Sequence, residues 1–247
     1  MREYLSRHEF GKHKGFRWRN ASEISRIEGF SDSVFAFAVT LLVVSLEVPK
    51  TFDELMAGMH GFLPFAAAFS ILFIIWLEQY RWFRQYGLQD GPSLWLNAAL
   101  LFVVLFFTYP LKFLFTWLFS AWTGGAGMVH LPNGATVPMV PNGQQSTLME
   151  IYGLGYLAVF LVLFLLHWRA WRLREELELT PLEEFITKGS MRQQALQMGI
   201  AVASVGLAVG GQPAWAGLVY VAIGPVMTVN GMIMGKRQRR EFGDELK

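Results

Sequence analysis

Long apolar runs alternate with short charged segments along this chain. After Asp32 no charged residue occurs before Glu47, and five further apolar runs follow. A helix that crosses a bilayer needs roughly 20 mostly apolar residues. The pattern therefore predicts six membrane-spanning helices, at about residues 26–48, 56–84, 93–121, 148–175, 192–209 and 213–235.

The fifth predicted helix is short and rich in small residues. It is separated from the sixth only by residues 210–213, whose sequence Gly-Gly-Gln-Pro is typical of a tight turn. Joined together, the two would form one apolar helix of about 40 residues, roughly twice the length that a bilayer requires. Two helices are therefore favoured over one.

The basic residues follow this division. Of the 21 Lys and Arg, 19 lie in the N-terminal tail, in the links after the second and fourth helices, or in the C-terminal tail. With six helices, all four segments fall on one side of the membrane, and an excess of Lys and Arg marks the cytoplasmic side. We expect cytoplasmic tails at residues 1–24 and 236–247, and a multi-pass protein of the cell membrane, plasma or inner.

Composition supports this assignment. Hydrophobic residues make up 53% of the 247 residues and charged residues 16%, against about 25% charged in soluble domains. The absence of cysteine excludes disulfides, thiolate metal sites and iron–sulfur clusters. No hydrophilic stretch is long enough to build a second core, so we expect one membrane domain over 1–247. Residues 122–147, rich in Gly, Pro and Asn, are expected to form an external loop.

The start of the first helix holds a carboxylate that needs a partner. The stretch from Ser25 to Glu28 fits a capping box, so the helix begins before Arg26 and Asp32 lies nearly two turns inside it. Arg26 and Asp32 are about 240° apart around the helix, too far to pair on its surface. Each therefore needs a partner from another helix or another subunit, unless Asp32 is hydrated in the headgroup layer.

Beyond Asp32, one face of the first helix combines hydroxyl and apolar side chains. Its members share a helical spacing of i, i+4, i+7, i+8 and i+11: Ser33, Phe37, Thr40, Leu41 and Val44. Ala36 and Ala38 beside this stripe allow another helix to approach closely. Taken alone, such a stripe is more often core packing than the lining of a pore.

The same residues resemble a known family. Arg26-x-x-x-Phe30-Ser31-Asp32 is similar to the signature of the endosomal/lysosomal (transmembrane protein 175-like) potassium channel family and its prokaryotic members. The similarity continues to Pro49 and recurs in two downstream segments. These run from Phe69-Ser70 to Trp76-Leu77, and from Leu96-Asn97 to Pro110.

This resemblance implies a single repeat of six transmembrane helices that assembles as a homotetramer, with a central pore lined by the first helix. Apolar side chains at Phe37, Leu41 and Val44 would form the constriction, and Thr40 would favour potassium. The motif residues would hold helices and subunits together in a polar network: Arg26, Phe30, Ser31 and Asp32. The implied function is a weakly to moderately potassium-selective cation channel gated by a hydrophobic constriction.

Two pore positions depart from the family pattern. Phe37 stands where the family usually has isoleucine or leucine, so four rings would meet at the constriction. Ser33 replaces a frequent glycine and adds a hydroxyl at the pore mouth. The expected partners are other copies of this chain, membrane lipids and permeating potassium ions, with no cofactor and no nucleic acid.

Other function classes are less well supported. The five histidines have no metal-ligand spacing to one another or to carboxylates, and no nucleophile or phosphate-binding motif occurs. We therefore expect no catalytic residue and no resident metal. The alternative is a secondary transporter for a small cation or a proton-coupled solute. Transporters usually place ionisable residues or broken helices near the midplane, whereas the charges here lie toward helix ends.

Overall fold

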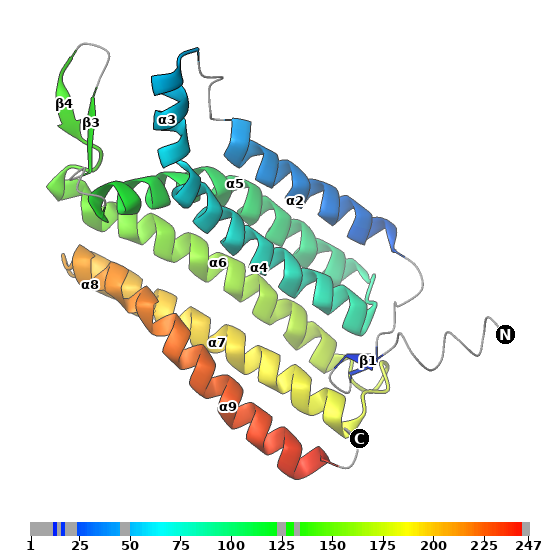
Figure 1. Cartoon of the computed structure of the whole chain (residues 1–247). Coiled ribbons are helices and arrows are strands. Elements are labelled where there is room, and N and C mark those ends of the chain that lie inside the picture. Colours follow the sequence, from blue (N-terminus) through cyan, green and yellow to red (C-terminus); the bar gives the residue numbers. More distant parts are fainter. Residues whose placement is uncertain are drawn as a thin grey trace.

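A computed structural model describes residues 12–13, 16–17, 24–44, 50–122, 127–130 and 134–243, which form a bundle of long helices (Figure 1). The helices are α2 (Arg26–Val44), α3 (Phe52–His60), α4 (Phe62–Tyr86), α5 (Gly91–Trp122), α6 (Gln145–Arg172), α7 (Pro181–Val209), α8 (Pro213–Leu218) and α9 (Ile223–Phe242). Short 3₁₀ turns are η1 (Asn142–Gln144) and η2 (Val219–Ala222).

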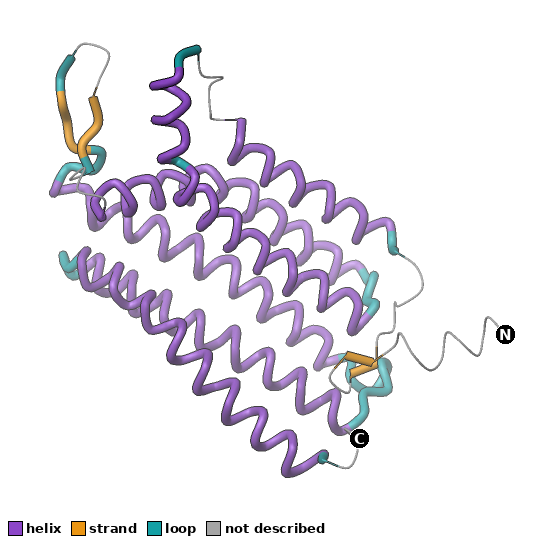
Figure 2. Tube along the Cα trace, viewed as in Figure 1, coloured by secondary structure: helices purple, strands orange, loops and turns teal. Residues whose placement is uncertain are grey.

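Among the described residues, strands occur only in two short antiparallel hairpins (Figure 2). One pairs β1 (Lys12–His13) with β2 (Phe16–Arg17), and the other pairs β3 (Met128–His130) with β4 (Thr136–Pro138). Phe16 is fully buried and packs edge-on against Tyr86 of α4, with ring centroids 5.4 Å apart. Part of the basic N-terminal tail is thus fastened to the bundle.

Helix α6 lies in the middle of the bundle. Helices α2, α4 and α5 pack together on one side of it, and α7 with α8 and α9 packs on the other (Figure 1). Four described segments are long and apolar enough to cross a membrane: Phe62–Tyr86, Gly91–Ser120, Gln145–Arg172 and Pro213–Phe242. With α2 and α7 they make six helices, as the sequence predicts.

Three of the helical spans that we predict from the sequence have different bounds in the structure. The predicted helix at 213–235 is divided into α8, the 3₁₀ turn η2 and α9, and it extends to Phe242. The predicted helix at 56–84 is divided at Gly61 into α3 and α4. Pro64, in the first turn of α4, lacks the N–H that would continue the hydrogen-bond ladder through the break. The predicted helix at 192–209 instead begins at Pro181, where Thr180 and Glu183 form a capping box. Hydropathy missed this start because the first turns of α7 are polar.

Helix α7 carries several polar side chains that face the protein rather than lipid. Gln194, Gln197 and Ser204 are buried, and the Gln197 side-chain oxygen accepts a hydrogen bond from Tyr156 of α6 at 2.7 Å. The Ser204 hydroxyl donates to the carbonyl of Ala216 in α8 at 2.9 Å. These bonds satisfy polar groups that lipid could not, and they bind α7 to its neighbours on both sides.

Glycines bring helix α6 close to its two partners. A Cβ atom on Gly155 would overlap the ring of Phe107 in α5, lying only 2.8 Å from its Cζ atom. A Cβ on Gly153 would overlap Val205 of α7. Small residues at such positions let transmembrane helices approach until their backbones nearly touch. The sequence therefore sets the tight packing of α5, α6 and α7.

An ion pair joins the end of α6 to the residue that precedes α5. The Arg169 guanidinium lies 2.9 Å from the Asp90 carboxylate, which also accepts a hydrogen bond from Ser93 at 2.6 Å. Burial alone would raise the pKa of Asp90, but the hydrogen bonds from Ser93 and Arg169 and the charge of Arg169 outweigh it and lower the pKa. Asp90 is therefore held as a carboxylate.

Candidate functional site

Helix α2 begins as the sequence predicts. The Ser25 N–H donates to the Glu28 carboxylate at 2.8 Å, and the Glu28 N–H donates to the Ser25 hydroxyl at 3.2 Å. This reciprocal capping box satisfies two amides of the first turn. Asp32 consequently lies in the second turn, inside the helix, and its carboxylate is not a cap.

The two faces of α2 have different environments. One face packs against α4 and α5 and is buried at Glu28, Ser31, Phe35, Ala38 and Leu42. The opposite face carries the predicted stripe and is exposed in the single chain. Phe37 is 56% exposed and Leu41 41% exposed, and Ser33 and Thr40 are exposed beside them. The side chain of Val44, at the end of α2, lies outside the described part of the chain.

The two hydroxyls of the stripe bond to the backbone of their own helix. The Ser33 hydroxyl donates to the carbonyl of Gly29 at 2.8 Å, and the Thr40 hydroxyl donates to the carbonyl of Ala36 at 2.9 Å. A hydroxyl has one proton and two lone pairs, so each oxygen remains an acceptor on an exposed face. Such an oxygen can bind a cation or a water molecule.

The buried face of α2 is held by polar side chains from α4 and α5. The Asn97 amide of α5 donates to the Ser31 hydroxyl at 3.0 Å, and the Gln79 amide of α4 donates to the Asn97 side-chain oxygen. All three side chains are at most 1% exposed. In an apolar interior these bonds stabilise one rotation of α2, because turning the helix would leave buried polar groups without partners.

The predicted motif residues divide between the two faces. Ser31 is in the Asn97 network, and Asp32 accepts a hydrogen bond from the indole N–H of Trp76 in α4 at 2.7 Å. Asp32 thus has the partner from another helix that its spacing requires. Asp32 is nevertheless exposed, as are Arg26 and Phe30, and Phe30 is 60% exposed. The described residues provide no ion-pair partner for Arg26.

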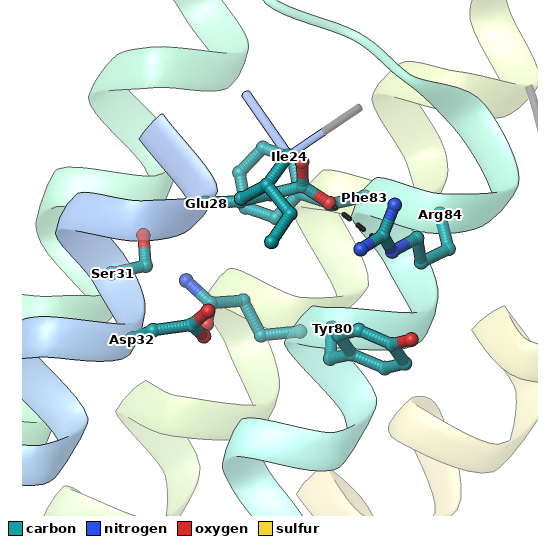
Figure 3. A pocket seen from close by; sticks show the side chains of 8 residues that line it. Ile24, Glu28, Ser31, Asp32, Tyr80, Phe83 and Arg84 are labelled. Carbon is teal, nitrogen blue, oxygen red and sulfur yellow. Dashed lines mark ion pairs between the residues drawn. The ribbon is translucent and has the colours of Figure 1, made fainter. Parts of the chain in front are cut away.

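A small polar pocket lies between the start of α2 and the end of α4 (Figure 3). The Glu28 carboxylate lies 3.7 Å from the Arg84 guanidinium on one side, and Asp32 with Tyr80 lies on the other. The cavity measures about 10 Å³, close to the smallest volume that holds one water molecule. It can hydrate this corner of the site but cannot hold a larger ligand.

A lysine holds the other end of α2. The Lys112 ammonium of α5 donates to the carbonyl of Leu42 at 2.7 Å. Leu42 is in the last turn of α2, where carbonyls lack partners within the helix and carry the negative end of its dipole. The two ends of α2 are therefore tied to α4 and α5 by different polar contacts, which leave the stripe itself uncovered.

Reasoning from the sequence missed the roles of several of these partners. Gln79, Asn97 and Lys112 were not assigned to the site. Asn97 is an uncharged polar residue inside an apolar run, and this signal often marks an interhelical hydrogen bond. Nothing in the sequence alone relates it to Ser31, which lies 66 residues away. Among the described residues, no cluster of His, Cys, Asp or Glu could hold a metal ion.

These helices define a multi-pass α-helical membrane protein. The profile of the family described as endosomal/lysosomal potassium channel TMEM175 matches residues 26–108, which contain α2 and its partners Trp76, Gln79 and Asn97. A protein of Marivirga tractuosa, named as a potassium channel, is 36% identical over 242 residues, covering 95% of this chain and 96% of that protein. The chain belongs to the TMEM175 family.

Other relatives agree with this assignment. A protein of Chamaesiphon minutus, also named as a potassium channel, is 32% identical over 105 residues, covering 39% of this chain and 52% of that protein. A crystal structure of a variant of the potassium channel MtTMEM175, in complex with a nanobody fusion protein, is similar with a TM-score of 0.78. It is 35% identical, and the match covers 92% of this chain and 99% of that one. The fold is therefore that of a bacterial TMEM175-like protein.

Proposed function

We propose that this chain is a potassium channel in which α2 helices from four copies line a central pore. Its family and the names of its relatives support potassium as the permeating ion. Each chain supplies one repeat of six helices, so several copies are needed to surround a pore. Potassium passes as the permeating ion, and no cofactor takes part.

The observation that carries this proposal is the exposed stripe on α2. Phe37 and Leu41 lie opposite the face that α4 and α5 cover, on the same side as the Ser33 and Thr40 hydroxyls. The Ser33 and Thr40 oxygens keep a free lone pair on this face, which lipid would leave without a partner and a permeating cation could use. Four copies around one axis place the large side chains at the narrowest point and the oxygens next to the ion path.

In this arrangement, Phe37, Leu41 and Val44 form a hydrophobic constriction. A narrow apolar ring excludes water, and ions with it, until the ring widens. The Thr40 oxygens then replace part of the hydration shell of potassium, which favours it over sodium, and Ser33 lies at the pore mouth. The Asn97 network opposes rotation of α2, so gating would have to strain or break it.

The orientation in the membrane follows from charge. The start of α2, the end of α9 and the links that follow α4 and α6 lie at one end of the bundle (Figure 1). This end carries Arg81, Arg84, Arg169 and Arg172, together with the basic residues at the end of α9. Because basic residues accumulate on the cytoplasmic side, we place both termini there, in the cell membrane.

Flux measurements on vesicles test this function. Wild-type protein should carry potassium faster than sodium. Phe37→Ala should raise potassium flux because the constriction becomes wider, and Thr40→Ala should lower the ratio of potassium to sodium flux. Val43→Ala is the control, because Val43 is exposed on the same helix but lies to the side of the stripe.

Three results would count against the proposal. If neither wild type nor Phe37→Ala carries cations, the chain is not a channel. If the flux ratio is unchanged in Thr40→Ala, the role of Thr40 is wrong. If flux requires a proton gradient and saturates at low potassium concentration, the chain is a transporter. The mass of the purified assembly should equal four chains of 28.0 kDa, and a stable monomer would exclude the shared pore.

A further inference from the structure

A large cavity lies between α5 and α6 on one side and the segment from α8 to α9 on the other; Ile71 of α4 also lines it, and no residue of α2 does. Its volume is about 480 Å³, within the roughly 300–1,000 Å³ of small-molecule pockets. Its inner walls are buried at Phe107, Leu111 and Met149, and its rim is exposed at Leu118 and Val221. The cavity therefore opens from the interior of the bundle to the outside of the helices.

The walls of the cavity are almost entirely apolar. Three tyrosines line it, and two of them turn their hydroxyls to protein acceptors: Tyr152 donates to the carbonyl of Pro110, and Tyr156 donates to the Gln197 side chain at 2.7 Å. The Tyr220 hydroxyl is buried close to Gly153 of α6. Tyr152 and Tyr156 therefore present rings rather than hydroxyls to the space, which leaves at most the Tyr220 hydroxyl as a polar group. Water is a poor occupant because a buried water needs two to four polar partners. An empty cavity would deprive every wall of its dispersion contacts, so an apolar molecule is the better occupant.

The surroundings identify which apolar molecule can reach this space. The rim belongs to segments long and apolar enough to cross a membrane, so acyl chains of the bilayer are the apolar molecules within reach of the opening. Trp117 lines it and Trp215, 59% exposed, lies on α8 next to it. Tryptophan collects at the level of lipid headgroups. We propose that the cavity binds an acyl chain of a membrane phospholipid, with the headgroup near these tryptophans and the chain reaching inward to Phe107.

Local sequence keeps the cavity open. Its α8 wall includes two small residues, Ala214 and Gly217, beside Pro213 and Leu218. The following turn, Val219–Ala222, is a 3₁₀ helix rather than an α-helix. Pro225, in the first turn of α9, lacks an N–H and disfavours a regular helix through this point. The segment thus bridges the bundle without filling the space against α5.

Photolabelling tests the lipid site. The full chain is placed in vesicles of phosphatidylcholine that include a phosphatidylcholine with a diazirine in one acyl chain, and adducts are mapped by mass spectrometry after irradiation. Adducts should concentrate on Phe115, Leu118 and Leu218 over the open lipid-facing surface at Val229 and Met232 of α9. This concentration should be lost in Gly217→Phe and in Ala214→Phe, which fill the cavity.

Gly217 and Gly224 make a matched pair for this test. A Cβ on Gly217 would meet only the Met149 sulfur, at an ordinary 3.7 Å, so a larger side chain can enter the cavity. Gly224 has no neighbour within 4 Å of an added Cβ and does not line the cavity. Gly224→Phe should therefore keep the wild-type labelling. Two filling variants are used so that a folding defect in one leaves the other to decide.

Because the sequence has no cysteine, Leu118→Cys reports what covers the rim. With an acyl chain in place, this cysteine should neither form a disulfide between copies nor react with a water-soluble maleimide. A disulfide between copies would mean that a neighbouring subunit fills the cavity, and rapid reaction with the maleimide would mean that it holds water. Either result would overturn the lipid site, as would labelling that survives both filling variants. None of these readouts depends on ion flux.

Discussion

The bond between Gln79 and Asn97 offers the sharpest test of how α2 is held. Asn97 is fully buried, accepts from the Gln79 amide and donates to the Ser31 hydroxyl at 3.0 Å. Asn97→Leu keeps a side chain of similar size and removes both bonds. The Ser31 hydroxyl still donates to the carbonyl of Ile27 at 2.8 Å, whereas Gln79 loses its acceptor in the interior.

The size of the effect follows from these contacts. A buried donor left without an acceptor costs about 1–3 kcal/mol, so Asn97→Leu should lower the free energy of unfolding by that amount. Gln79→Leu leaves the Asn97 oxygen without this donor and should cost a similar amount. When both residues are replaced, neither the Gln79 amide nor the Asn97 oxygen is left without its partner. The loss of unfolding free energy should then be smaller than the sum of the two single losses. Interhelical hydrogen bonds in membrane proteins average about 0.6 kcal/mol and reach roughly 1.7, which sets the expected coupling between Gln79 and Asn97.

The free energy of unfolding can be measured by SDS titration in mixed micelles for the wild type, the two single variants and the double variant. Gly199→Ala is the control for the effect of preparing and unfolding a variant protein, because an added Cβ there meets no atom within 4 Å. Strictly additive losses would show that Gln79 and Asn97 do not interact. A neutral Asn97→Leu would refute the claim that this network holds the buried face of α2.

Two further predictions concern the packing of the bundle. Asp90→Asn should lower the free energy of unfolding by about 1 kcal/mol or less at neutral pH. Because the pKa of Asp90 is lowered, the wild type should lose this advantage as the pH falls below 3.8. A difference in denaturation midpoint that does not change with pH would contradict this prediction. Gly155→Ala should cost about 1–3 kcal/mol by overlap with Phe107, measured by thermal unfolding, and a midpoint equal to that of Gly199→Ala would show that α5 and α6 are not in close contact there.

Much of the architecture could be predicted from the chain because membrane helices follow simple rules. Charge-free runs indicate the helices, and the basic residues indicate which links share a side. The capping box at Ser25 places Asp32 inside α2, as the structure confirms. Hydropathy alone does not determine where the helices begin and end. It does not detect the break at Gly61 or the capping box at Thr180, although the local sequence indicates both.

Helical periodicity alone determines that Ser33, Phe37, Thr40 and Leu41 share one face of α2. Periodicity cannot decide whether that face is buried. Apolar residues occur on every face of α2, so hydrophobicity does not distinguish one side from the other. Only the packing of α4 and α5 decides this, since burying Phe35 and Leu42 leaves the opposite side uncovered.

Tertiary structure also decided how the polar side chains pair. Ser31, Gln79 and Asn97 come from three different helices, and a buried polar group can be satisfied by any partner that the fold brings within reach. The sequence therefore determined which residues require partners, as Asp32 does. Which partner each one received depended on how the helices are rotated and how deeply they lie against one another.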